Sequence, residues 1–186
     1  MGLLLAAGAG RRMGGPKALV ADSSGTPWVV ATARRLAAGG CDPVRVVLGA
    51  AADRASGALD AETVDIVVAT DWAEGMGASL RRGLDGLDQL APISRAALVH
   101  LVDLPDVGTD VVRRMVAVAA AAGPDALARA SYAGTPGHPV LLGRDHWAAA
   151  AGAAGADRGA RDYLATRRVE LVECSDLATG RDVDRR

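Results

Sequence analysis

Short apolar runs alternate along the chain with longer stretches whose apolar positions recur at helical spacing. The runs have the length of β-strands and show little polar alternation, so we expect both faces of each strand to be buried. The pattern predicts strands at residues 3–7, 44–48, 64–69, 96–102, 127–132, 139–142 and 169–174.

The segments between these runs are rich in alanine and predict the helices. Leu80, Leu84 and Leu87 lie at helical spacing. Thr26-Pro27 has the form of a helix start, with Thr26 at the cap and Pro27 at the first helical position. We predict helices at residues 27–38, 53–60, 78–90, 109–122, 145–151 and 159–166.

This alternation of strands and helices predicts an α/β fold with three α/β/α layers around a mostly parallel sheet. The 186 residues fit a single domain, residues 1–186, large enough to bury a core. Half of the residues are hydrophobic and none is Phe, so Ala, Val and Leu must build that core. Ligands of such sheets bind beyond the carboxyl ends of the strands, so the loops after the strands are the places to search for chemistry.

Composition narrows the class of protein. A net charge of −1 gives no sign of a general nucleic-acid surface. Membrane helices need about 18 or more consecutive apolar residues, and no apolar run reaches that length; the start lacks the form of a signal peptide. Cys41 and Cys174 match no metal-binding spacing, and we expect both to be reduced thiols in the core. We expect a cytoplasmic protein that binds neither nucleic acid nor membrane.

The loop at residues 8–17 combines several glycines with three basic side chains directly after the first predicted strand. A P-loop would need Ser or Thr after its lysine, and Ala18 follows Lys17. A dinucleotide loop would need an acid after the second strand, where the chain reads Leu48-Gly49-Ala50. Pro16 also disfavours a helix running directly through the loop.

Two interpretations of the loop remain. In the first, backbone amides and basic side chains wrap a nucleoside triphosphate, because glycine lets the backbone approach the ligand and cations neutralise its oxyanions. In the second, the loop is a solvated basic turn. The first is favoured, since a turn needs neither so many glycines nor three cations.

Residues 4–17, LLAAGAGRRMGGPK, closely resemble the L-A-A-G-x-G/S-x-R-M-G-x-x-K signature of nucleotidyltransferases with the GT-A-like fold. Within them the chain most resembles the molybdenum cofactor cytidylyltransferases. Further motifs of that subgroup are matched in order by residues 74–84, 101–105, 134–142, 156–164 and 182–184. The chain departs from the pattern at Leu104 (usually Gln), at Ala156 (usually Gly) and at its end, where Arg185-Arg186 replaces Thr-Pro-Glu-Asp.

The resemblance implies a Rossmann-like GT-A nucleotidyltransferase fold and Mg²⁺-dependent transfer of CMP from CTP to molybdopterin, with release of pyrophosphate. The implied partners are CTP or another nucleoside triphosphate, a molybdopterin-type acceptor and a molybdoenzyme. By analogy, Ala6-Ala7-Gly8 goes with cytidine. The alternatives are GTP as donor, a different phosphorylated acceptor, or a non-catalytic protein that hands molybdenum cofactor to its partner enzyme; a hydride-transfer enzyme is disfavoured by the missing acid.

The residues implied for catalysis are Arg12, which would stabilise the departing pyrophosphate, Lys17, which would stabilise the α-phosphate, and Asp103. Arg11 is the weaker candidate, because the signature leaves its position free. The implied nucleotide-binding residues are Ala6, Ala7, Gly8, Gly10, Arg12, Lys17 and Ser79. The implied acceptor-binding residues are Gly137, His138, Asp157 and Arg161.

A magnesium site is expected where Asp103 ends an apolar strand, because Mg²⁺ prefers carboxylate oxygens and bridges phosphates. Asp182 or Asp184 is the expected second ligand. Because side chains alternate along an extended chain, we expect only one of this pair to face the metal. His100 lies inside an apolar strand and is expected to be structural.

Overall fold

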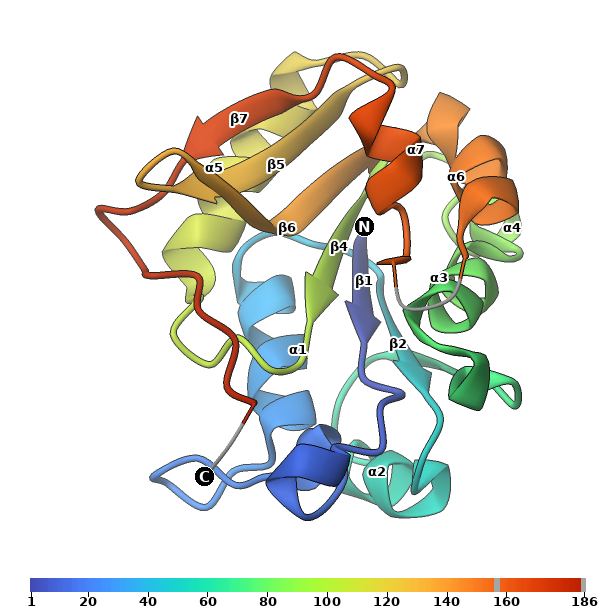
Figure 1. The fold of residues 1–186 in the computed structure, drawn as a ribbon, viewed down its shortest axis with the longest axis vertical. Coiled ribbons are helices and arrows are strands. Elements are labelled where there is room, and N and C mark those ends of the chain that lie inside the picture. Colours follow the sequence, from blue (N-terminus) through green and yellow to red (C-terminus); the bar gives the residue numbers. More distant parts are fainter. Residues whose placement is uncertain (156–157, 185–186) are drawn as a thin grey trace.

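The computed structural model describes residues 1–155 and 158–184, which form a seven-stranded sheet with helices on both faces (Figure 1). The sheet order is β3-β2-β1-β4-β6-β5-β7. The strands are β1 (Gly2–Leu5), β2 (Val44–Leu48), β3 (Asp65–Val68), β4 (Ala96–Leu101), β5 (Leu127–Tyr132), β6 (Thr135–Gly143) and β7 (Glu170–Glu173).

The sheet is mixed, with most of its pairings parallel. Strands β3, β2, β1 and β4 run parallel, and β7 pairs parallel with β5. Only β6 runs antiparallel to its neighbours β4 and β5. It begins at Thr135, earlier than expected, because Ala133 and Gly134 take positive φ and turn β5 directly back into a hairpin.

The helices lie where the alanine-rich segments predict them. They are α1 (Trp28–Ala38), α2 (Ala52–Ala58), α3 (Met76–Leu84), α4 (Leu87–Leu90), α5 (Thr109–Ala121), α6 (Trp147–Ala153) and α7 (Arg161–Ala165). Short 3₁₀ turns are η1 (Arg11–Met13), η2 (Lys17–Leu19), η3 (Trp72–Glu74) and η4 (Arg144–His146). Within the described residues, no helix is long and apolar enough to cross a membrane.

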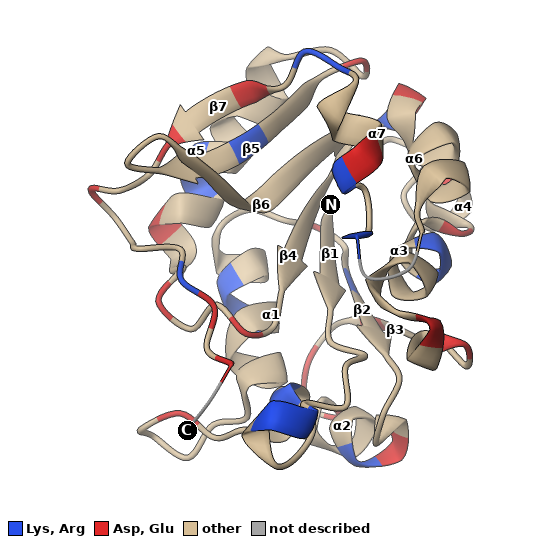
Figure 2. Cartoon of the chain, in the orientation of Figure 1, with Lys and Arg blue, Asp and Glu red and all other residues tan. Residues whose placement is uncertain are grey.

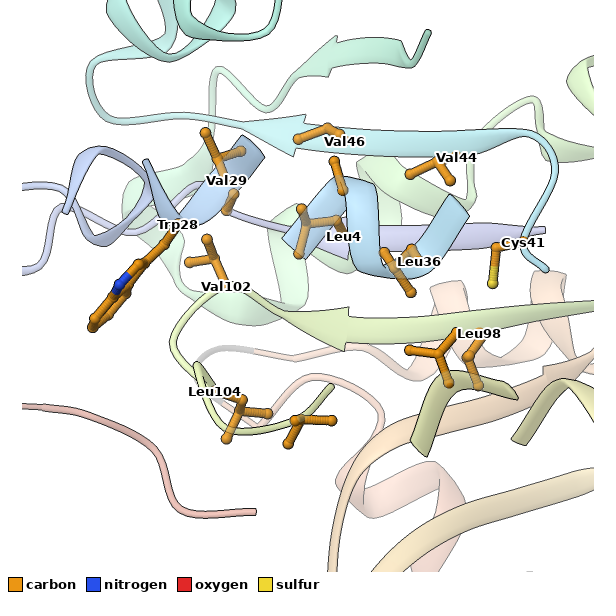
Figure 3. Close-up of a cluster of buried hydrophobic side chains, with 14 of the residues drawn as sticks. Leu4, Trp28, Val29, Leu36, Cys41, Val44, Val46, Leu98, Val102 and Leu104 are labelled. Carbon is orange, nitrogen blue, oxygen red and sulfur yellow. The ribbon is translucent and has the colours of Figure 1, made fainter. Parts of the chain in front are cut away.

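Alternate residues of the central strands build two separate cores, which confirms the three-layer α/β/α arrangement. Leu4 and its same-face neighbours on β2 and β4 pack against α1 and α5; Figure 3 shows part of this cluster, with Leu36 and Cys41. Leu3 and Leu5 face the other way and pack with side chains of α3, α4, α6 and α7. Each central strand is therefore covered on both faces, which is why its sequence is continuously apolar.

Several local predictions differ from the structure. The helix expected over residues 78–90 is two helices, because Gly86 takes a positive φ of 66° and breaks it. The expected cap is wrong by one position: α1 begins at Trp28 with Pro27 at the cap, and Thr26 instead joins the preceding turn, where its N–H donates to Asp22. The first strand ends at Leu5, two residues early.

The chain after β7 runs down one side of the molecule to the loop at the carboxyl end of β4 (Figure 1). Two contacts hold it there: the backbone N–H of Val183 donates to the carbonyl of Asp103 at 3.0 Å, and Thr179 donates through its N–H and hydroxyl to Asp106. The last described residues therefore lie beside the loop that follows β1. Cys41 and Cys174 are free and buried, as expected.

Candidate functional site

The loop between β1 and η2 is a compact turn built on Gly10. This residue has a φ of +58°, and its carbonyl accepts hydrogen bonds from the N–H groups of Met13 and Gly15. A Cβ at Gly10 would lie 2.0 Å from the carbonyl oxygen of Gly15. The close turn therefore requires glycine here, both for its backbone conformation and for space.

A cavity of about 450 Å³, which we call the loop cavity, lies against this turn. Its walls come from the loop, from the segment around η3 and the start of α3, and from the end of β4. They include Gly8, Gly10, Arg11, Lys17, Trp72, Ser79 and Asp103. The loop cavity opens beyond the carboxyl ends of β1 and β4, which is where the α/β pattern predicts ligand chemistry.

Lys17 forms an ion cluster with two carboxylates from distant parts of the chain. Its Nζ lies 2.7 Å from Oδ2 of Asp103 and 2.5 Å from Oδ1 of Asp184. Although burial favours its neutral form, these hydrogen bonds raise the pKa of Lys17. The hydrogen bond from Lys17 is also the main cause of the lowered pKa of Asp184. Lys17 is therefore a fixed positive charge at neutral pH.

Asp103, Asp182 and Asp184 form a cluster in which one oxygen of each lies within 4.8 Å of the other two. The expectation that only one of Asp182 and Asp184 faces this point is wrong. The two residues are two positions apart, and such residues on an extended chain point to the same side. The return of the C-terminal segment onto Asp103 brings both to the site.

A second cavity of about 1000 Å³, the sheet cavity, lies on the face of the sheet that carries α3 and α7. The residues that line both this cavity and the loop cavity are Leu5, Lys17, Met76, Leu101 and Asp103. Its other wall carries Arg129, Gly137, His138 and Arg161. The two cavities meet at Lys17 and Asp103, so groups bound in each would meet at one lysine and one carboxylate.

His138 lies on β6 in the wall of the sheet cavity. Burial, and secondly the positive charge of Arg129, lowers the pKa of His138 to about 4. The carbonyl of His138 accepts a hydrogen bond from the hydroxyl of Tyr132 at 2.7 Å, which fixes the backbone at this position. His138 is therefore a neutral hydrogen-bonding group at neutral pH.

Charged residues gather around the meeting point of the cavities. Figure 2 shows basic residues on the helical turns after β1 and acidic residues along the C-terminal segment that passes them. Arg12 points its Nη1 toward Asp184, at 3.6 Å from Oδ2, and its side chain is 76% exposed.

Most of the residues implied by the sequence lie on one of the cavities. Arg11, the weaker candidate, lines the loop cavity, whereas Arg12 lines the sheet cavity. Ala6 lines neither cavity; it is buried in the core, and its N–H donates to the carbonyl of Val47. Asp157 lies outside the described residues.

Trp72 and Arg129 are among the cavity residues that sequence reasoning did not find. Trp72 in the loop cavity follows β3, so its place after a strand was a usable signal. Arg129 in the sheet cavity lies within β5, where the sequence alone gives no sign that its side chain faces a ligand.

Comparisons with known proteins agree on one family. The profile of the MobA-like NTP transferase domain matches residues 2–172. Nicotine blue oxidoreductase from Paenarthrobacter nicotinovorans is 37% identical over 193 residues, which cover 98% of this chain and 91% of that protein.

Solved structures show the same fold. Rv0371c from Mycobacterium tuberculosis H37Rv superposes with a TM-score of 0.82 at 28% identity, covering 99% of this chain and 91% of that one. Its complex with manganese gives 0.75 at 25% identity over 93% and 86% of the two chains. A nucleotidyl transferase from Methanothermobacter thermautotroptrophicus gives 0.74 at 24% identity over 94% and 86%, a likeness of fold.

Proposed function

This chain belongs to the MobA-like NTP transferase family, and we propose that it transfers CMP from CTP to a molybdopterin-type acceptor and releases pyrophosphate. The proposal treats residues 1–186 as one nucleotidyltransferase domain. The observation that carries it is the meeting of the two cavities at Lys17 and Asp103. A triphosphate in the loop cavity and an acceptor phosphate in the sheet cavity would bring their reacting atoms to that point.

In this reaction an oxygen of the acceptor phosphate forms a bond to the α-phosphorus of CTP. The bond from that phosphorus to the oxygen bridging to the β-phosphate breaks, and pyrophosphate leaves with its electron pair. Two anions must approach each other, so the main requirement is positive charge held in place beforehand. Lys17 supplies such a charge, because its two carboxylate partners position the ammonium group.

The donor side of the site is assigned to the loop. Backbone amides around Gly8 and Gly10 would approach the phosphates, and Arg11 and Arg12 would neutralise the pyrophosphate from two sides. Ser79, at the start of α3, would donate to a phosphate or to the base. Ala7 lies in the wall of the loop cavity, where its methyl group would crowd a purine more than a pyrimidine. This position supports CTP rather than GTP as the donor.

The acceptor side is assigned to Gly137, His138 and Arg161, all of which line the sheet cavity. Neutral His138 could donate a hydrogen bond to the acceptor without adding charge. Asp157 is kept as an acceptor-binding residue because of the sequence resemblance alone. A partner molybdoenzyme, to which the modified cofactor would pass, also stays a proposal.

The acid cluster fits a divalent cation. Three carboxylate oxygens within 4.8 Å of one another are the donor set that Mg²⁺ and Mn²⁺ prefer, and Rv0371c has been solved with manganese. Asp103, Asp182 and Asp184 would hold the ion, with phosphate oxygens completing its coordination. The bound ion would neutralise phosphate charge. Lys17 would then exchange one of its carboxylates for a phosphate oxygen.

A second candidate activity, oxidoreduction, is favoured by the relative named nicotine blue oxidoreductase. A nicotinamide dinucleotide could place its pyrophosphate on the same glycine loop. The chain after β2 reads Leu48-Gly49-Ala50, which lacks the acid that usually binds the ribose hydroxyls of such a cofactor. Nucleotidyl transfer therefore remains the first proposal.

A thermal-shift panel separates these functions, because a ligand that binds the folded state raises its apparent stability. The panel contains CTP, GTP, ATP and UTP with Mg²⁺ or Mn²⁺, and NADH and NADPH alone. We expect the largest shift with CTP and metal, followed by pyrophosphate release when acceptor is added. A shift with NADH or NADPH alone would favour oxidoreduction, and CTP binding without turnover would favour the non-catalytic cofactor carrier. No shift with any nucleotide would refute the proposal.

A further inference from the structure

The floor of the sheet cavity is apolar. It is formed by side chains of β1, β4 and β6 that face α3 and α7: Leu5, Val99, Leu101, Val140 and Leu142. Charged groups lie at its edges, with Lys17 and the acid cluster on one side and Arg129 on the β5 side. This arrangement suits a ligand with an apolar body and charged ends.

Arg129 stands on β5 at this far edge and is half-buried. Its Nε and Nη2 both donate to the carbonyl of Gly137, at 3.2 Å each. A guanidinium has five N–H groups, so these two bonds leave others available to a ligand. The bonds to Gly137 also fix the direction of the planar group, which lowers the entropy lost on binding an anion.

A second guanidinium faces the same cavity without a counter-ion among residues 1–155 and 158–184. Neither Arg129 nor Arg161 forms an ion pair with another of these residues, whereas the neighbouring Arg158 pairs with Asp162 at 3.0 Å. Burial, and secondly the positive charge of Arg161, lowers the pKa of Arg129. Both guanidiniums line the same cavity, so an anion bound there could be held by both.

A purely structural role for Arg129 is the plain alternative, since its bonds to Gly137 join β5 to β6. The hairpin is already held by its ladder and by the bond from the Tyr132 hydroxyl to the carbonyl of His138. A structural role predicts that removal of the guanidinium costs stability and leaves anion binding unchanged. The two roles can therefore be separated by experiment.

We propose that Arg129, together with Arg161, binds a second anionic group of the acceptor, remote from the phosphate that reacts. The inference deepens the proposed function and rests on it for the identity of the reacting phosphate. The substrate class is then an acceptor whose body packs on the apolar floor, with one anionic group at Lys17 and another at Arg129. An acceptor with a single phosphate and a neutral far end would leave Arg129 and Arg161 without a ligand.

The test measures binding of 1-anilinonaphthalene-8-sulfonate, a fluorescent probe with an apolar ring body and one anionic group. We expect Arg129→Met to weaken its binding at least about tenfold, the scale of a charge-assisted hydrogen bond, and Arg129→Lys to weaken it less. Arg161→Met, a change at an exposed position, should weaken it about threefold. The matched control is Arg113→Met on α5, an exposed arginine paired with Asp110, which should stay within about twofold of wild type.

A crystal of the wild-type protein soaked in tungstate gives the location directly, with anomalous density expected between Arg129 and Arg161. Probe binding within about twofold of wild type in folded Arg129→Met and Arg161→Met, or tungstate found only at Lys17, would overturn the inference. CTP binding by each variant is measured alongside. If the wild-type protein does not bind CTP, that result counts against the proposed function but does not contradict the anion site.

Discussion

The loop cavity and the sheet cavity are neighbours built by different means. The loop cavity takes its shape from backbone, with Gly10 in a conformation and a space that only glycine fits. The sheet cavity takes its character from side chains, an apolar floor edged by arginines. Backbone amides suit the phosphates that all nucleotides share, whereas side chains can change one at a time. Under the proposed function, this difference would let donor binding and acceptor choice vary independently on one sheet.

The comparison is sharpest at Lys17, the basic residue that lines both cavities. We expect Lys17→Met to lower turnover at least about 100-fold, because it removes a preorganised charge from the transition state. Asp103→Asn should have an effect of similar size. Pyrophosphate release with CTP and Mn²⁺ measures both, with Arg113→Met as the control. Near wild-type rates in either variant would mean that the reaction takes place elsewhere.

The backbone origin of the loop cavity can be tested with a matched pair of glycines. Gly10→Ala would place a Cβ 2.0 Å from a carbonyl oxygen at a φ of +58°, whereas Gly14→Ala has the positive φ but open space around it. We expect a loss of about 2–4 kcal/mol for Gly10→Ala and about 1 kcal/mol for Gly14→Ala, by chemical denaturation. Equal losses in the two variants would show that the close contact at Gly10 is unimportant.

CTP affinity extends the same test to function. CTP binding is measured at low temperature, where the Gly10→Ala variant remains folded. Gly10→Ala should weaken CTP binding, and Gly14→Ala should weaken it less. The probe of the sheet cavity should bind both variants as it binds wild type. A parallel loss of both ligands would show that the two cavities are one cooperative unit.

The shared edge of the cavities should also hold the metal. We expect Asp182→Asn and Asp184→Asn each to weaken Mn²⁺ binding about tenfold, since each removes one ligand charge. Calorimetric titration measures the affinity, and Asp176→Asn, an exposed residue paired with Arg114, is the control. An unchanged affinity in one of the two variants would identify the other as the sole ligand of the pair.

The sequence was sufficient for the elements that depend on local pattern. The continuous apolar strands and the helix over residues 109–121 follow from hydrophobic spacing, and Asp103 follows from its place at a strand end. The antiparallel direction of β6 was not predicted, because the β5–β6 hairpin turns on a positive φ at Ala133, a conformation that alanine rarely adopts. The break of the predicted helix at Gly86 depends on one backbone angle, which the sequence permits without requiring.

The candidate site was predictable to the extent that it lies in motifs. Lys17 and Asp103 were found from the loop and the strand end, and the structure brings them to 2.7 Å. The joint approach of Asp182 and Asp184 depends on a C-terminal segment that returns from β7 to the loop after β4. The place of Arg129 in the site depends on which face of β5 carries its side chain. Sequence reasoning gave that strand no chemical role.

Acidification should have a smaller effect, through two histidines of lowered pKa: His138, which lines the sheet cavity, and His100, which is fully buried on β4 and lines neither cavity. Burial lowers the pKa of His100 to about 3, and neither of its ring nitrogens has a hydrogen-bond partner among the described residues. The pKa of His138 is lowered to about 4. In the unfolded chain each histidine has a pKa of about 6.5, so as the pH falls it is protonated in the unfolded state before it is protonated in the folded state. Stability therefore falls as pH drops below about 6.5 toward the folded pKa values.

His100→Leu isolates the larger shift. The variant removes a buried imidazole that has no hydrogen-bond partner within residues 1–155 and 158–184, so we expect it to match or exceed wild-type stability at pH 7. Between pH 7 and pH 5.5 it should lose about 1 kcal/mol less than wild type, because one proton-uptake site of the unfolded chain is gone. Urea denaturation at both pH values measures this above the range in which carboxylates titrate. An identical pH dependence in the two proteins would mean that His100 is protonated, or finds a partner, inside the folded core.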